Sequence, residues 1–260
     1  MTTKNRDSSV VAVPSAALEQ VLAQIMEPDS FEDYCPNGLQ VEGRPQVRRL
    51  VSAVTASAAT ICRAAALRAD ALLVHHGLFW RGDDQRLTGF RFRRVRLLIE
   101  HGIGLHSYHL PLDAHPELGN NACLARVMGW RLDGRAGRYG LLSITEFTRS
   151  VSARSLATRL RQRLGRPPLV VGASERPIRR LIWCTGAAQD EIEEAIALGA
   201  DAFVSGEISE RTTHMAREAG IVYFAAGHHA TERYGVKALG EAVAAQLGIW
   251  HGFVDDDNPA

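Results

Sequence analysis

Two adjacent histidines, His75 and His76, follow a short apolar run and carry side chains suited to metal binding or proton transfer. Imidazole is a common ligand for zinc, iron, nickel and copper, and it also acts as a general acid or base. The preceding residues, Ala71 to Val74, are typical of a buried parallel strand. The pair therefore falls at the C-terminal end of a strand, where open α/β sheets bind ligands. Taken alone, the pair could also be two capped, hydrogen-bonded histidines.

The strand–helix–strand pattern that ends at these histidines occurs a second time. When residues 48–77 are laid on residues 179–208 without a gap, 11 of the 30 positions are identical at a constant offset of 131. Such similarity predicts an internal duplication. The two histidines align with Gly206 and Glu207, so a carboxylate ends the strand in the second copy.

Each copy is followed by a further apolar strand and a histidine–acid pair. One strand leads to His109 and the other to His228, and the acids Asp113 and Glu232 come four residues later. Residues four apart share one face of a helix. Pro111 favours a turn rather than a helix in the first pair.

These residues together form a set of nitrogen and oxygen ligands. The set comprises His75, His76, Asp113, His228 and Glu232, with His109, Glu207 and His229 close by in the pattern. Such ligands suit Zn, Fe, Mn, Ni or Co rather than Cu(I) or an iron–sulfur cluster. Five ligands, two of them carboxylates able to bridge, exceed the needs of one tetrahedral zinc. The sequence therefore predicts two divalent ions per chain.

The composition is that of an ordinary globular protein, with a net charge of +1, 46% hydrophobic residues and 23% charged residues. No basic bias points to nucleic acid. Residues 1–14 lack an apolar signal-peptide core, and no apolar stretch is long enough for a membrane span, so we expect a cytoplasmic protein. The four cysteines are scattered, which favours reduced, packed thiols over disulfides or a thiolate metal site.

The hydrophobic spacing predicts the elements that would hold these ligands. Helices are expected over residues 15–26, 56–69, 120–129, 152–164 and 231–247, and strands over 48–54, 71–76 and 141–147. Alternating strands and helices with a duplicated unit indicate an α/β fold. The segment from Pro36 to Gly43 is expected to be a loop that leads into a strand.

Two features beside the ligand set bear on a substrate. Arg91, Arg93, Arg94 and Arg96, extended by Arg81 and Arg86, could contact phosphates. Such a run is more often the solvated face of a helix. Trp80 could stack on a base, although an aromatic residue after a strand usually serves packing.

Five segments of the chain resemble the Nif-three-like family in its short bacterial form. They are residues 37–43, 74–80, 109–116, 205–207 and 227–232. The resemblance implies two intertwined, duplicated α/β domains, one formed by residues 1–128 with 222–260 and the other by 129–221. It also implies a toroidal homohexamer whose metal sites face the interior.

The resemblance assigns roles to the candidate residues. It implies that His75, His76, Asp113, His228 and Glu232 bind the two ions, with the two carboxylates able to bridge. His109 would lie at the second shell or on a metal-bound water, and Glu207 would face the same cavity. His109, Glu207 or His229 could then move a proton during a reaction.

Two functions agree with this resemblance. Family members are identified as GTP cyclohydrolase type 2 homologues and dinuclear-metal-centre proteins, which implies hydrolytic opening of the guanine imidazole ring of GTP with release of formate. The chain has no Walker-type loop for a triphosphate. The alternative is a non-catalytic hexamer that binds or delivers metal or regulates other proteins.

Overall fold

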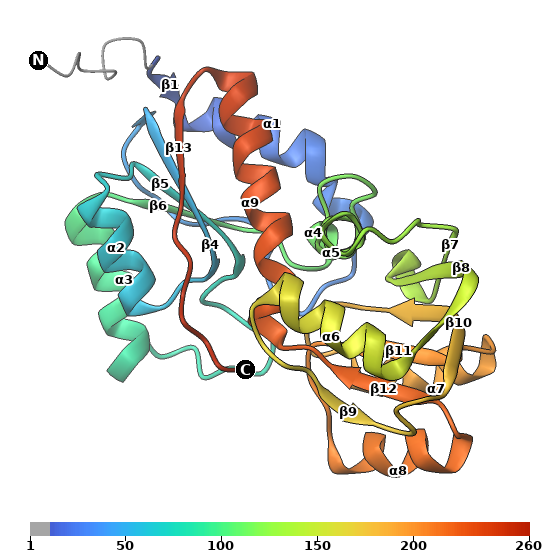
Figure 1. The fold of residues 1–260 in the computed structure, drawn as a ribbon. Coiled ribbons are helices and arrows are strands. Elements are labelled where there is room, and N and C mark those ends of the chain that lie inside the picture. Colours follow the sequence, from blue (N-terminus) through green and yellow to red (C-terminus); the bar gives the residue numbers. More distant parts are fainter. Residues whose placement is uncertain (1–10) are drawn as a thin grey trace, which may run out of the picture. The chain divides into compact units, whose positions relative to one another are not determined.

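The computed structural model describes residues 11–260, which form two compact units. The first unit comprises the chain as far as Leu112 together with Val236–Asp256, and the second comprises Asp113–Gly235 together with Asp257–Ala260. Each unit contains an open sheet with helices on its faces (Figure 1). The expected α/β fold is confirmed. No helix among residues 11–260 is long and apolar enough to cross a membrane.

The first unit is built on a five-stranded sheet. In sheet order its strands are β13 (Trp250–Phe253), β4 (Arg49–Thr55), β5 (Ala71–His76), β6 (Gly104–Ser107) and β2 (Gly38–Val41). The first four run parallel, and β2 is antiparallel to β6. A short ribbon of β1 (Val13–Pro14) and β3 (Gln46–Val47) lies outside this sheet. The parallel order brings the C-terminal ends of β4, β5 and β6 to one edge.

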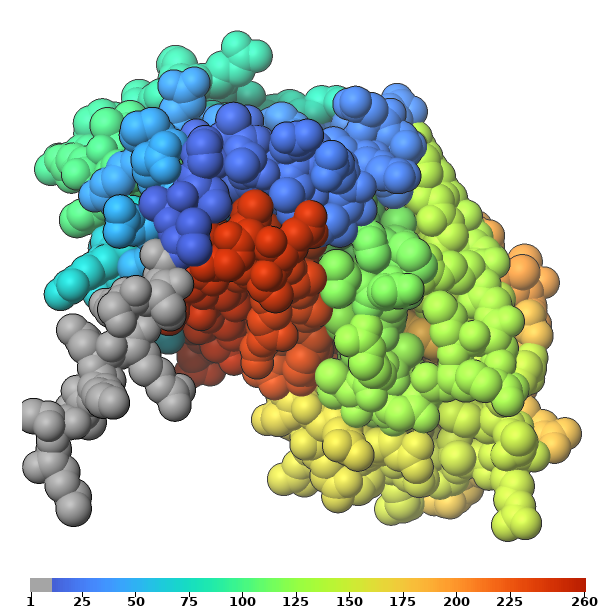
Figure 2. Space-filling view, turned by 90° about the horizontal axis from the view of Figure 1, so that it is seen from above, coloured from blue at the N-terminus to red at the C-terminus, as the bar shows by residue number. Residues whose placement is uncertain are grey.

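Helices cover both faces of this sheet. On one face, α2 (Ala58–Ala66) and α3 (Gly89–His101) pack against the fully buried Leu72 of β5 and Leu105 of β6. The other face carries α1 (Ser15–Met26) and the C-terminal half of α9 (His228–Leu247), which lie side by side in Figure 2. Burial on both faces explains why the strands read as continuous aliphatic runs in the sequence.

The four arginines of the run lie on α3, where Arg93 and Arg96 are exposed and Arg91 and Arg94 are half-buried. Leu98 is the one fully buried residue of this helix, whereas Phe90 and Ile99 are more than half exposed. Arg96 pairs with Glu100 one turn along the helix, and the Arg94 guanidinium lies over the Phe90 ring. Two of the four arginines thus have a partner on the same helix.

The second unit is built on a six-stranded sheet. In sheet order its strands are β7 (Gly134–Ala136), β8 (Leu142–Ser152), β10 (Pro177–Trp183), β11 (Ala202–Ser205), β12 (Val222–Ala225) and β9 (Leu169–Val171). The central three strands, β10, β11 and β12, are parallel, and every other neighbouring pair in the sheet is antiparallel. The carboxyl ends of β11 and β12 therefore lie next to each other at one edge.

Four helices flank this second sheet. Helices α5 (Asn120–Met128) and α6 (Ala153–Leu164) share one hydrophobic core with the sheet, and α7 (Ile192–Ala197) and α8 (Glu210–Ala219) share the other. The Ser152 hydroxyl accepts a hydrogen bond from the Ser155 amide at 3.2 Å and so caps α6.

The two units repeat one structural detail at the offset found in the sequence. In the first unit, an Asp70 carboxylate oxygen accepts hydrogen bonds from the amides of Arg48 and Arg49, at 2.9 and 3.1 Å. In the second unit, an Asp201 oxygen accepts from Arg179 and Arg180, at 2.8 and 2.9 Å. In both units this aspartate ties the start of one parallel strand to the start of the next. The structure thus supports the predicted duplication.

Two local expectations need correction. The His109–Asp113 segment was expected to be a turn, but Leu110–Ala114 forms a short helix, α4. Pro111 is compatible with it because the first turn of a helix leaves its amide groups without helical partners. Helix α9 begins at His228 rather than at Thr231, so both His228 and Glu232 lie within its first turns.

His106 on β6 makes the stability of the first unit depend on pH. Its side chain is 1% exposed, and burial lowers the pKa of its imidazole to about 4. In the unfolded chain the His106 imidazole binds a proton below about pH 6.5, whereas in the folded chain it stays neutral down to about pH 4. The free energy of unfolding therefore falls as the pH decreases from 6.5 to 4. We expect His106→Leu to reduce the loss of unfolding free energy between pH 7 and pH 5 by roughly 2 kcal/mol.

Urea unfolding of metal-free protein at the two pH values measures this effect. The matched control is His101→Gln, because His101 is exposed on α3. An unchanged pH dependence in His106→Leu would assign the acid sensitivity to other groups.

Candidate metal centre

Three imidazoles meet at the C-terminal edge of the first unit's sheet. His75 and His76 end β5, and His109 follows β6 by two residues. One ring nitrogen from each of the three lies within 4.8 Å of those of the other two. His75 and His109 are buried, and His76 is half-buried. The parallel order of β5 and β6 is what places all three at the same edge.

Oxygen partners fix the orientation of the two β5 histidines. The Nδ1 atom of His75 lies 3.0 Å from the backbone carbonyl of Tyr108. A carbonyl can only accept, so Nδ1 of His75 donates and the lone pair of the neutral ring is on Nε2. The Nδ1 atom of His76 lies 3.1 Å from the hydroxyl of Thr55 on β4. Such outer partners are typical of metal-ligating histidines.

Asp33 orients the third histidine. Its carboxylate lies 2.9 Å from Nδ1 of His109 and accepts hydrogen bonds from the Leu110 amide and the Asn37 side chain at 2.9 and 3.0 Å. Burial raises the pKa of Asp33, but the hydrogen bonds from His109 and Asn37 outweigh it and hold that pKa well below its usual range. A carboxylate–histidine pair of this kind fixes the ring and increases its basicity as a ligand.

Sequence reasoning missed Asp33 and the thiol of Cys35. Ligand atoms of Asp33, Cys35 and His109 lie within 4.8 Å of one another, and Cys35 is 7% exposed. Both residues precede the Asn37-Gly38 turn motif, and their spacing in sequence carries no metal-binding signature. None of the four cysteines, all within residues 11–260, forms a disulfide.

The second unit brings His228 together with two carboxylates. Glu207, two residues after the end of β11, lies 2.6 Å from Nδ1 of His228. Glu232 lies 3.1 Å from Nε2 of His228, one helical turn along α9. Burial lowers the pKa of His228, but the hydrogen bonds and charges of Glu232 and Glu207 outweigh it and raise that pKa to about 9. In the metal-free protein, His228 is therefore a cation near neutral pH.

Two glycines allow this close approach in the second unit. A Cβ atom on Gly206 would lie 2.6 Å from the Gly186 carbonyl and 2.7 Å from Cα of His228. A Cβ atom on Gly186 would collide with the Glu232 carboxylate. This explains physically why the position aligned with His75 holds a glycine in the second copy.

The remaining candidates also lie in the second unit. The Asp113 carboxylate on α4 accepts a hydrogen bond from the Asn120 side chain at 2.7 Å. His229 is 6% exposed, and its backbone amide donates to the Ala260 carbonyl at 3.3 Å. His229 belongs to none of the ligand groups found among residues 11–260.

The donor atoms fit a divalent transition metal. Within the first unit, three imidazoles with Nδ1 against an oxygen gather at one end of the sheet. Within the second unit, the His228 imidazole lies against the Glu207 and Glu232 carboxylates. A neutral imidazole carries one ring-nitrogen lone pair, and a divalent cation binds such lone pairs. Zinc, iron, manganese, nickel and cobalt all accept such a donor set.

Comparison with known proteins identifies the family of this chain. A family model described as Duf34/NIF3 (NGG1p interacting factor 3) matches residues 15–259. This chain belongs to the Duf34/NIF3 family. The resemblance found in the sequence is thereby confirmed.

Curated and structural relatives extend over almost the whole chain. A protein of Allochromatium vinosum named "GTP cyclohydrolase 1 type 2 homolog" is 52% identical, over 91% of this chain and 93% of its own length. The solved structure of ybgI, described as of unknown function, has a TM-score of 0.91 at 43% identity and covers 95% of this chain and 100% of its own. TTHA1606 from Thermus thermophilus has a TM-score of 0.86 at 34% identity, with 95% and 100% covered.

Proposed function

We propose that this Duf34/NIF3 protein binds two divalent metal ions and hydrolyses a substrate of the GTP cyclohydrolase type 2 kind. The proposed ligands are His75, His76, Asp113, His228 and Glu232. The reaction would open the imidazole ring of a guanine and release formate, and the protein would act as a homohexamer in the cytoplasm.

The observation that carries the proposal is the imidazole cluster of the first unit. All three rings have Nδ1 within hydrogen-bond distance of an oxygen. The partner of His75 is the Tyr108 carbonyl, which can only accept, so the lone pair of the neutral His75 ring is on Nε2. A purely structural cluster would not need this uniform orientation. The names of the relatives supply the reaction class.

Bound divalent ions would supply Lewis acidity and lower the pKa of water toward about 7. The chain's own residues would then orient ligands and move protons. Asp33 holds the proton on Nδ1 of His109 and keeps that ring directed toward His75 and His76. Glu207 orients His228 through Nδ1, and its side chain is 41% exposed, so it can also exchange a proton with solvent. His229 remains a proposed proton carrier from its place beside His228.

Formate release from GTP by the full chain, reloaded in turn with each of Zn, Fe, Mn, Ni and Co, tests the proposed reaction. We expect release that depends on the metal and is abolished by a chelator. The variant His76→Ala removes one proposed ligand from the end of β5, and we expect it to lose formate release under the same conditions. Formate release that persists without metal, or no formate release with any of the five metals, would contradict the proposal.

A specific observation favours a second function, metal delivery. Cys35 adds a thiol to the group that contains Asp33 and His109, next to the three imidazoles. Adjacent ligand groups that share His109 would let an ion move between them. Two ions per chain, rapid transfer to a chelating acceptor and no formate from any guanine compound would favour this function over hydrolysis.

A further inference from the structure

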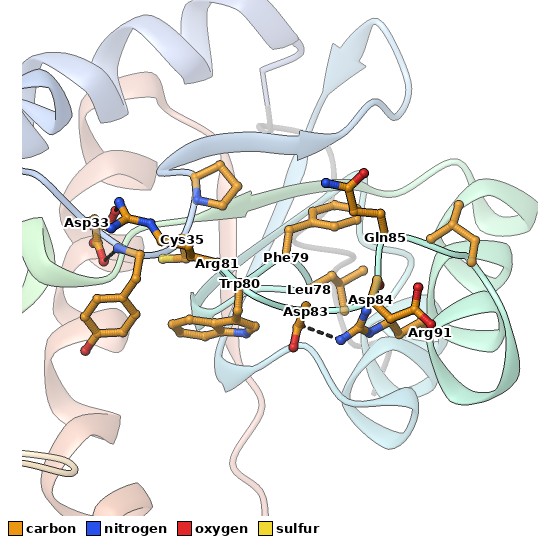
Figure 3. Close-up of a pocket in the computed structure, with 13 residues that line it drawn as sticks. Asp33, Cys35, Leu78, Phe79, Trp80, Arg81, Asp83, Asp84, Gln85 and Arg91 are labelled. Carbon is orange, nitrogen blue, oxygen red and sulfur yellow. Dashed lines mark hydrogen bonds and ion pairs between the residues drawn. The ribbon is translucent and has the colours of Figure 1, made fainter.

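A cavity of about 500 Å³ opens beside the imidazole cluster, wholly within the first unit. Its lining combines the segment before β2 with the segment between β5 and α3, and includes Tyr34, Trp80 and Arg91. The volume lies in the range of sites for small organic ligands. Figure 3 shows the Trp80 ring among the residues that line it.

Aromatic rings join this cavity to the candidate metal centre. The Trp80 ring lies 5.2 Å from the His109 ring, nearly perpendicular to it, and 5.9 Å from the His76 ring. The Tyr34 ring lies 5.0 Å from His109 and 6.0 Å from Trp80. Tyr34 is 51% exposed and Trp80 half-buried, so a large aromatic surface borders the cavity. Planar heterocycles stack on such surfaces.

The charges of the lining do not favour a triphosphate. Arg91 forms an ion pair with Asp83 at 2.6 Å, drawn as the dashed line in Figure 3. Arg81 donates to the Asp33 carbonyl at 2.9 Å, and the third acid, Asp84, pairs with an arginine outside the lining. Three acids and two arginines leave the lining with a net charge of −1. A polyphosphate would therefore meet no net positive charge in the lining, and both lining arginines already have partners.

We propose that this cavity binds a planar nitrogen heterocycle, as a free base or nucleoside, by stacking on Trp80 and without need of a triphosphate. The inference rests on the proposed function and defines the substrate class of that site. The ring would lie beside His109 and His76, and the Gln85 amide in the lining offers one donor and one acceptor to its polar edge.

Tryptophan fluorescence and calorimetry on the full chain test this inference, with guanosine, GTP and inorganic triphosphate as probes. We expect guanosine and GTP to bind with dissociation constants within about threefold of each other, and triphosphate not to compete. Trp80→Leu should weaken both nucleoside ligands about 10-fold. The matched control, Trp250→Phe, should leave both dissociation constants unchanged. Trp250 lies on β13 against the guanidinium of Arg49 and does not line the cavity.

Two results would overturn the inference. One is GTP binding more than about 10-fold tighter than guanosine, with displacement by triphosphate. The other is unchanged guanosine affinity in folded Trp80→Leu. If Trp80→Leu does not fold, Arg81→Gln replaces it: unchanged GTP affinity supports the inference, and a large loss contradicts it. Metal content and formate release, measured on the same samples, report separately on the proposed function.

Discussion

Replacing Glu232 by glutamine is expected to remove most of the bound metal while the chain stays folded. The change keeps the shape of the side chain but removes the negative charge that lies 3.1 Å from Nε2 of His228. Substitution of an outer partner already weakens metal binding about 10- to 100-fold, so loss of a proposed bridging ligand should cost about 100-fold or more. Asp113→Ala is expected to have the same effect.

Metal content per folded chain, measured by mass spectrometry beside circular dichroism, gives the result. Glu218→Ala is the matched control, since this carboxylate is exposed on α8 in the same unit. Full metal content in both Glu232→Gln and Asp113→Ala would rule out the ligand assignment.

The substitution Gly206→Ala is expected to damage both stability and metal binding. The added methyl would lie within 2.7 Å of the Gly186 carbonyl and of Cα of His228, and both contacts are backbone atoms that cannot turn aside. The backbone hydrogen bonds from Gly206 to Gly186 and from Gly227 to Gly206, at 2.8 and 2.9 Å, would have to shift. Overpacking of this kind costs about 3 kcal/mol.

Chemical denaturation and metal titration of Gly206→Ala measure the two effects. Gly134→Ala on β7 is the matched control, because its added Cβ would meet only Ile144, at an ordinary 3.9 Å. Equal free energies of unfolding for Gly206→Ala and Gly134→Ala would contradict the close backbone contact between Gly206 and His228.

Much of the fold followed from local patterns in the sequence. Helix α1 occupies the predicted residues 15–26, and β5 ends at the predicted histidines, because apolar spacing and the boundaries of the buried strand are local properties. Asp70 and Asp201 make equivalent hydrogen bonds in the two units, which supports the duplication predicted from the sequence. Pro111 favours a turn in the sequence, but the structure has a short helix from Leu110, because the first turn of a helix accepts proline.

The sequence indicated the histidines but not their supporting partners. His75, His76 and His109 stand out because rare, reactive side chains follow apolar strands. Asp33 and Cys35 come from an irregular segment, and only the pairing of β2 with β6 brings that segment to His109. Contacts of this kind depend on tertiary structure and leave no periodic trace in the sequence.

The metal content of the untagged 260-residue chain tests the proposed metal centre. It is determined by mass spectrometry without added metal and again after equilibration with each candidate ion. We expect about two divalent ions per folded chain. We also expect a chelator to remove them without unfolding either unit. Fewer than one ion per chain after equilibration with every candidate metal would contradict the metal centre and, with it, the proposed hydrolase.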